Sequence, residues 1–338
     1  MPPSQSETPS VTSDLVGDWG KIARAHLESL GYATGDLGDP EHSTIALLNV
    51  QRHRVSRRPR RVHRSRELID PDDELSDLIA AVGRGDDLTP FQSKLHGPFF
   101  NDHLLNDWGI HHFHLVPSAV DTNDKLLFAW VTEDDLYAIQ ILGHQGGGHR
   151  TFEDQQLIEI LHQNWPELLA SYRAPGVVPG SLSGPHTPTA RRMFRVAGSL
   201  MGTQTSDGTV YTPPGGGAAM GGIPADPKRK GLSVEVALAR NRCMEFLTVN
   251  QRGLSTKGQA FVDIARACGC QFEFAFPIHL RLAYHKGSFY IQHKDSGVTA
   301  LLAPSPVLVH TAGDAWLTPE RSTHTADEAV DPAAGTLV

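Results

Sequence analysis

The sequence contains few cysteines and no long apolar run. Its 338 residues include 3 cysteines, an odd and small number that is typical of a reducing compartment and argues against a disulfide scaffold. No run reaches the roughly 18 apolar residues that a transmembrane helix needs. The first residues, MPPSQSETPSVTSD, lack the apolar centre of a signal peptide. We therefore expect a cytoplasmic protein without a membrane partner.

Positive charge is also in deficit. Acidic residues outnumber basic residues by 38 to 30, and the net charge is −8. The total charge therefore does not by itself favour a nucleic-acid partner, so the distribution of charge along the chain matters more. Glycine and proline are abundant, with 32 and 23 residues, and indicate substantial loop structure. The length suits two compact units, or one unit with long irregular segments.

Apolar spacing predicts a first α+β domain over residues 13–172, after a disordered tail of residues 1–12. A helix is expected to end near Gly31, Thr44–Val50 has the apolar run of a buried strand, and a short helix follows Pro71. Three strands with short connections then favour an antiparallel β-meander packed by helices: Ile110–Val116, Lys125–Thr132 and Leu136–Leu142. An amphipathic helix over Asp154–Leu169 completes the domain, and Pro166 is predicted to kink or end it.

The rest of the chain predicts a second, smaller unit. Residues 173–230 are rich in proline and glycine and indicate a linker or long loops. A smaller α+β unit is expected over residues 231–320, followed by a loose tail over residues 321–338. Within this unit the spacing predicts two helices and three strands: Ser233–Val249, Lys257–Ala267, Phe272–Phe276, His279–His285 and Ser288–Lys294. The predicted fold class is α+β.

Four histidines lie within twelve residues, in and just before the first strand of the meander: His103, His111, His112 and His114. Because side chains alternate along a strand, His112 and His114 share one face, and Phe113 takes the other. Phe113 is typical of a core residue, so we expect His112 and His114 on an open face of the sheet. His144, just after the third strand, is expected on the same face.

Three hypotheses account for these histidines. In the first they are structural, capping backbone groups or lying exposed. In the second they form a zinc or manganese site with these candidate ligands: His112, His114, His144, and Asp102 or Asp107. In the third they cleave RNA without a metal, because one histidine accepts the 2′-hydroxyl proton and another protonates the leaving oxygen. Arg150 would then bind the phosphate.

A basic segment without any acidic residue precedes the meander. Its eight arginines are Arg52, Arg54, Arg57, Arg58, Arg60, Arg61, Arg64 and Arg66. Such a run can follow a phosphate backbone, because each contact displaces a counterion. No Phe, Tyr or Trp interleaves the run, so the sequence does not support base stacking there. The alternative is a solvated surface strand, or a surface that neutralises acidic residues of the chain itself, such as those of Asp70–Glu74.

The segments HHFHLV and KLLFAWVTEDDLYAIQILGH are followed by His149 and Arg150, so that the meander leads into a basic stretch that contains histidine. In this pattern the region from Ile110 to Arg150 resembles the RelE-type ribonuclease toxins of bacteria. The resemblance implies a ribonuclease fold and an RNA substrate. The chain departs from that family in its length, its acidic charge, and the histidines where the family's strands carry arginine and lysine. GIHHFHL and NWPEL are also similar to segments of uncharacterised bacterial proteins.

The sequence thus predicts a nucleic-acid-processing protein, an RNase-like toxin or defence component with RNA as its partner and no cofactor. The predicted acid–base residues are His112, His114 and His144, and Arg150 joins the eight arginines in binding nucleic acid. Two alternatives stay open. One is a non-enzymatic module that binds nucleic acid or a protein, and the other is a metal-dependent hydrolase with a His-x-His site.

Overall fold

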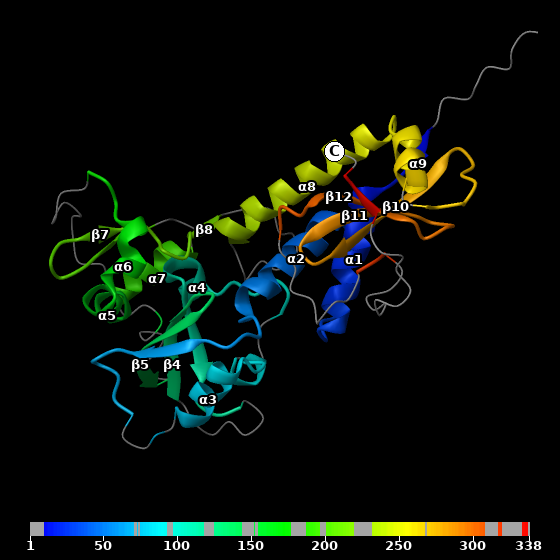
Figure 1. Ribbon diagram of the computed structural model, residues 1–338. Coiled ribbons are helices and arrows are strands. Elements are labelled where there is room, and N and C mark those ends of the chain that lie inside the picture. Colours follow the sequence, from blue (N-terminus) through cyan, green and yellow to red (C-terminus); the bar gives the residue numbers. More distant parts are fainter. Residues whose placement is uncertain are drawn as a thin grey trace, which may run out of the picture. The chain divides into compact units, whose positions relative to one another are not determined.

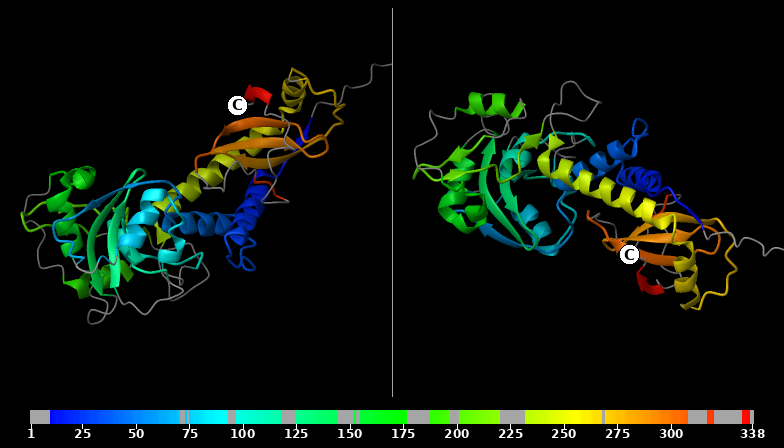
Figure 2. Two further views of the ribbon diagram at one scale, coloured as in Figure 1. Left: turned by 60° about the horizontal axis from the view of Figure 1, so that its bottom comes forward. Right: turned by 90° about the horizontal axis from the view of Figure 1, so that it is seen from above.

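The computed structural model describes residues 10–70, 73, 75–92, 97–117, 125–143, 152, 155–176, 187–196, 201–219, 232–267, 269–307, 317–319 and 333–336. The chain divides into two compact units, and their elements can be followed in Figures 1 and 2. Unit 1 comprises Met1–Leu48 and Leu238–Val338, and unit 2 is Asn49–Ala237. Both boundaries fall inside helices, α2 (Pro40–His53) and α8 (Val234–Leu254).

Unit 2 contains a four-stranded sheet with the order β2-β5-β4-β3. Its strands are β2 (Arg61–Arg64), β3 (Ile110–His114), β4 (Lys125–Val131) and β5 (Asp135–Gly143). The antiparallel pairs β3–β4 and β4–β5 confirm the predicted meander. β2 comes from the arginine-rich segment and pairs parallel to β5, which the sequence did not predict. In the described sheet, β2 and β3 are therefore the two edge strands.

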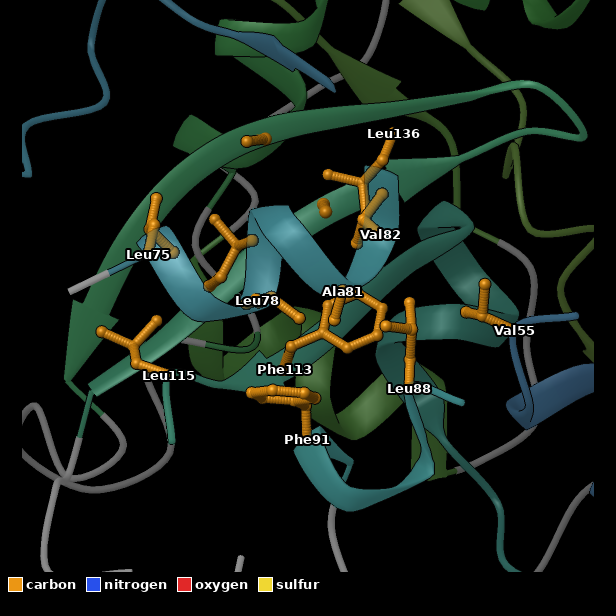
Figure 3. Close-up of a cluster of buried hydrophobic side chains, with 13 residues drawn as sticks. Val55, Leu75, Leu78, Ala81, Val82, Leu88, Phe91, Phe113, Leu115 and Leu136 are labelled. Carbon is orange, nitrogen blue, oxygen red and sulfur yellow. The ribbon is translucent and has the colours of Figure 1, made fainter. Parts of the chain in front are cut away.

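Helices cover both faces of this sheet. On one face α3 (Ser76–Arg84) and the short helix η1 (Thr89–Phe91) bury the apolar side chains of the three strands of the meander, with Phe113 near the centre (Figure 3). On the other face α5 (Gln156–Asn164) and α6 (Pro166–Leu169) pack against Ile110, Phe128 and Ile139 (Figure 1). A strand that is buried on both sides reads as a nearly continuous apolar run, as KLLFAWV does.

Short elements complete unit 2. α4 (His103–Trp108) precedes β3, and Gly109 takes a left-handed φ of 71° between them, so the chain turns sharply from helix to strand. The segment expected as linker or loops contains α7 (Pro188–Val196) and the strands β6 (Thr203–Gln204), β7 (Val210–Tyr211) and β8 (Ala218–Ala219) in its described part. A turn of helix, η4 (Ala170–Tyr172), and β9 (Leu232–Ser233) lie beside them in sequence.

Unit 1 combines both ends of the chain. Its sheet has the order β1-β10-β11-β12-β13, with strands β1 (Val11–Thr12), β10 (Ile278–His285), β11 (Ser288–His293), β12 (Thr299–Pro304) and β13 (Ala333–Thr336). Its helices are α1 (Leu15–Ser29), α9 (Gly258–Ala267), and the unit 1 parts of α2 and α8. The ring of Trp19 on α1 packs edge-to-face on Phe289 at 5.3 Å, and Phe246 of α8 stacks on the same ring at 5.6 Å.

The α+β class is confirmed, and so are several elements. α1 ends before Gly31, the helix pair α5–α6 breaks at Pro166, and α8, α9, β10 and β11 occur close to their predicted positions. The strand predicted at Thr44–Val50 is wrong, because this run lies in α2. Asp39 caps that helix by accepting the N–H groups of Glu41 and His42, a start signal that outweighs a short apolar run.

Several further expectations differ from the structure. The segments predicted as a disordered tail and a loose tail contribute the strands β1 and β13, which pair with β10 and β12. No strand forms at Phe272–Phe276. α1, expected in the first domain, belongs to unit 1, because its apolar face packs on strands that lie more than 200 residues further along the chain. None of the described helices has both the length and the apolar character that crossing a bilayer requires.

Candidate functional site

The histidines of β3 do not lie on an open face. His112 and His114 share a face with Ile110, as predicted, but the helices α5 and α6 cover this face. The ring of His112 lies 5.3 Å from the ring of Phe152, its Nδ1 lies 3.7 Å from Oδ2 of Asp102, and its side chain is 11% exposed. His114 is buried, with 9% exposure. The expectation of an open, histidine-lined face is therefore wrong.

The neighbouring histidines are held neutral by burial. His111 points to the opposite face of β3, where its ring stacks on Phe113 at 6.0 Å, and desolvation lowers its pKa to about 3. Burial is also the main reason why the pKa values of His53 and His103 are lowered. These lowered pKa values favour the neutral form of all three imidazoles at neutral pH.

The metal hypothesis gains no ligand set in the described part of the chain. There, no three His, Cys, Asp or Glu side chains are grouped closely enough to hold an ion. Asp102 faces His112, and Asp107 binds two arginines. His144 and Arg150 lie outside the described residues, so the roles given to them, and the zinc or manganese site, stay predictions.

Two arginines of the basic segment are structural. Arg52 on α2 binds the carboxylate of Glu235 and donates to Oδ1 of Asn106 at 3.1 Å and to the carbonyl of Gly215 at 2.7 Å. Its burial lowers its pKa to about 10. Arg60, 7% exposed, donates to the carbonyls of Thr132 and Ser56 at 2.9 and 2.8 Å. Their guanidinium groups therefore hold the fold together.

Other arginines of the segment meet acidic residues of the chain. Arg57 pairs with Asp87, and Arg58 pairs with Glu133 and Asp134. These partners are not the acidic residues of Asp70–Glu74 that the sequence suggested. Arg54 is half-buried. Arg64 and Arg66 are exposed, and neither has a carboxylate partner among the described residues. Nucleic-acid binding by these side chains stays a prediction.

A histidine that the sequence analysis did not single out is held in an exposed site on β2. Alternation places Arg61 and His63 on one face of β2, and the parallel register sets them beside Asp135 and Tyr137 of β5. Nε2 of His63 lies 2.8 Å from Oδ1 of Asp135, and Arg61 donates to both carboxylate oxygens, at 2.8 and 2.9 Å. The His63 ring stacks on Tyr137 at 4.7 Å, with 16° between the planes.

The electrostatics of this site follow from its hydrogen bonds. Those from Arg61, and then from His63, lower the pKa of Asp135, so its carboxylate stays charged. The side chain of His63 is 39% exposed and that of Arg61 75% exposed. Trp165 packs edge-to-face on Tyr137 at 5.1 Å. The site thus presents an oriented imidazole, a guanidinium and aromatic rings together.

A second group of charged side chains joins α7 to α4. Arg191 Nη1 and Arg195 Nε both donate to Oδ2 of Asp107, at 3.2 and 2.8 Å. Their guanidinium carbons lie 4.7 and 4.5 Å from the centre of the Trp108 ring. The sequence signal for this group was RRMFR, where arginines four residues apart share one face of a helix. The proline and glycine content of the surrounding segment predicts loop, which masks this helical signal.

Comparisons with known proteins give no relative for this chain. No family model, curated protein or solved structure matches it significantly. The resemblance to the RelE-type toxins therefore stays a prediction.

Proposed function

We propose that unit 2 binds and processes nucleic acid at the edge of its sheet, where β2 runs beside β5. The carrying observation is the His63 ring, which Tyr137 and Asp135 hold in place while 39% of the side chain stays exposed. Arg61 lies beside it on the same carboxylate. An exposed imidazole next to an exposed guanidinium offers a proton-transfer group and a phosphate-binding group together. The proposal keeps the predicted function and moves its acid–base residue from β3 to β2.

The neighbours of His63 favour a single-stranded substrate. Tyr137 stacks on one face of the imidazole, and Trp165 borders Tyr137. A single strand can place unpaired bases on such rings, whereas a duplex keeps its bases stacked internally. Arg66, exposed just beyond β2 and bonded to the neutral Asn164, adds positive charge for the backbone.

The chemistry that this site supports is metal-free cleavage of RNA. Asp135 is bonded to Nε2 of His63, and Nδ1 makes no hydrogen bond with a described residue. It would accept the proton of a 2′-hydroxyl, whose oxygen then forms a bond to phosphorus. The bond from phosphorus to the 5′ oxygen breaks, and the leaving oxygen takes a proton from water. Arg61 would neutralise the phosphate during this step.

The second candidate is a module that binds nucleic acid without cleaving it. The described part of this site holds a single histidine, whereas RNA cleavage commonly uses two proton-transfer groups. Binding needs only the exposed cations and rings.

The test is a cleavage and binding assay with the full chain. Metal-stripped protein is incubated with a fluorescent single-stranded RNA, with the same sequence as DNA, and with a duplex. We expect His63→Ala to lower the RNA cleavage rate by about 10²–10⁴-fold. His279→Ala is the matched control, because His279 is an exposed strand histidine of unit 1 that also makes a side-chain hydrogen bond.

Each outcome assigns the function differently. Loss of cleavage in His63→Ala but not in His279→Ala supports the proposal. Loss only in a folded His112→Gln or His114→Gln variant returns the acid–base role to β3. Cleavage only after zinc or manganese is added favours the metal-dependent hydrolase. Binding of single strands without cleavage, weakened by Arg61→Ala, leaves the binding module. Absence of both activities contradicts the proposed function.

A further inference from the structure

Helix α7 buries two of its arginines and exposes its large apolar side chains. Arg191 and Arg195 have 0% and 5% exposure, whereas Met193 and Phe194 have 68% and 45%. A surface helix normally buries its apolar residues and exposes its charged ones. Interactions of the buried arginines must therefore hold the helix in this orientation.

The protein supplies a rigid frame for the two guanidinium groups. Oδ2 of Asp107 accepts from both, and the Trp108 ring lies within cation–π distance of both. Trp108 is itself fixed, since its indole N–H donates to Thr203 at 3.1 Å. Arg195 Nη1 also donates to the carbonyl of Phe152 at 2.6 Å. Both arginines are thus fixed in position before any ligand arrives.

This frame does not balance all the positive charge of the two arginines, and it does not provide acceptors for all their N–H groups. Within the described residues two guanidinium groups face one carboxylate, that of Asp107, so this described group carries a net positive charge. Nε and Nη2 of Arg191, and Nη2 of Arg195, are buried and have no hydrogen-bond partner within the described residues. Nδ1 of His103 is buried in the same condition, and His103 is close enough to Arg195 for that charge to help lower its pKa. Buried donors without partners are rare in folded proteins.

We propose that Arg191 and Arg195 form a binding site for an oxyanion of the phosphate class. Such an anion offers several acceptor oxygens and a charge of −1 to −2, and guanidinium forks bind it through paired hydrogen bonds. It would satisfy the remaining N–H groups and neutralise the excess charge. The site is independent of the proposed nucleic-acid surface, since none of its residues lies on β2 or β5.

The competing explanation is an internal ion triad. In that case Asp107 alone would hold the two arginines, and their remaining donors would stay buried without a ligand. The two explanations differ in one measurable respect, because only a binding site responds to phosphate more strongly than to chloride at equal ionic strength.

The experiment is calorimetric titration of the full chain with inorganic phosphate, with chloride at matched ionic strength as the blank. We expect Arg195→Lys, which keeps the charge but loses the fork, to weaken phosphate binding about tenfold. Arg192→Lys is the matched control, because Arg192 is the exposed arginine of the same helix. Asp107→Asn serves as a second variant if Arg195→Lys does not fold. It should change the phosphate affinity measurably, because Asp107 holds both guanidinium groups.

The source of the anion is tested with the same protein. A nucleoside monophosphate that binds much more tightly than phosphate, while the nucleoside alone does not bind, would identify a nucleotide site. Equal affinity for both would identify a site for the free anion. Absence of phosphate binding, or binding that Arg195→Lys and Arg192→Lys weaken equally, overturns the proposal. Neither result depends on RNA cleavage or on His63.

Discussion

The two edges of the sheet in unit 2 carry similar side chains in opposite surroundings. At one edge, β3 places His112 at 3.7 Å from Asp102, under the helices of the covered face. At the other edge, β2 places His63 at 2.8 Å from Asp135, and 39% of the histidine side chain is exposed. The edge that is richer in histidine is therefore the buried one. A cluster of histidines in a sequence identifies a strand's polar positions but not whether a substrate can reach them.

The difference has a physical origin in what covers each edge. β3 follows directly after α4, and α2 and α7 contribute Arg52, Arg191 and Arg195 to the contacts of α4. β2 has only its inner face in the core, through Val62, and its other face holds Arg61 and His63. Arginines on an exposed edge also discourage pairing with the edge of another chain, so their presence alone does not establish a ligand.

The largest expected difference between the two edges is in stability. Phe113→Ala on β3 should destabilise unit 2 by about 3–5 kcal/mol, because its ring is fully buried and leaves a cavity. Val62→Ala on β2, which is only partly buried in the same cluster, should lower the free energy of unfolding by about 1 kcal/mol. Urea denaturation of both variants measures this, and equal losses would contradict the comparison.

Acid should weaken the β3 edge selectively. The pKa of His111 is about 3 in the folded protein against an ordinary value of 6.5. The unfolded chain therefore binds a proton first as the pH falls below 6.5, and stability is lost down to about pH 3. Because part of the residue is exposed, we expect a loss of about 1–2 kcal/mol between pH 7 and pH 5 from His111.

His111→Gln should remove this part of the pH dependence. His53 and His103 have lowered pKa values for the same main reason and keep the remaining slope of the same sign. Hydrogen–deuterium exchange of the β3 segment at pH 7 and pH 5 follows the effect. An unchanged pH slope in His111→Gln would show that this ring does not titrate on unfolding.

A smaller effect is expected at Asp102, which both caps α4 and faces His112. Its side chain accepts the N–H groups of Leu104 and Leu105, each at 3.0 Å. Asp102→Ala should lower the stability of unit 2 by about 1 kcal/mol through the lost cap, whereas Asp102→Asn should keep most of it. If both variants lose the same stability in thermal unfolding, the carboxylate charge rather than the cap is what matters.

The smallest effect on stability is expected at the open edge. Arg61→Ala should lower the free energy of unfolding less than Val62→Ala or Asp102→Ala does, because the Arg61 side chain is 75% exposed and Asp135 keeps its hydrogen bond with His63. The same variant should weaken binding of single-stranded RNA and reduce the salt dependence of that binding by about one counterion. A loss of stability without a change in RNA binding would make Arg61 a structural residue, like Arg52 and Arg60.

Much of the fold could be read from the sequence where patterns are local. The meander, the break at Pro166 and the pair β10–β11 each follow from alternation, helical spacing or turn residues over short stretches. The strand predicted at Thr44–Val50 failed because a short apolar run suits a buried helix equally well. The place of α1 in unit 1 depends on contacts with residues far along the chain, which local patterns do not contain.

For the candidate sites, too, some features follow from local sequence patterns and others depend on contacts between distant residues. The sequence determined the residue types, the α+β class, and which side chains of a strand share a face, because these depend on composition and on the period of two. Only the tertiary structure decided which faces are covered, and it buried the β3 histidines that had looked accessible. It also brought Tyr137 and Trp165 to a basic segment that has no aromatic residue of its own, and set two arginines of α7 around one carboxylate of α4. Such pairings arise from packing between distant elements, which no local pattern specifies.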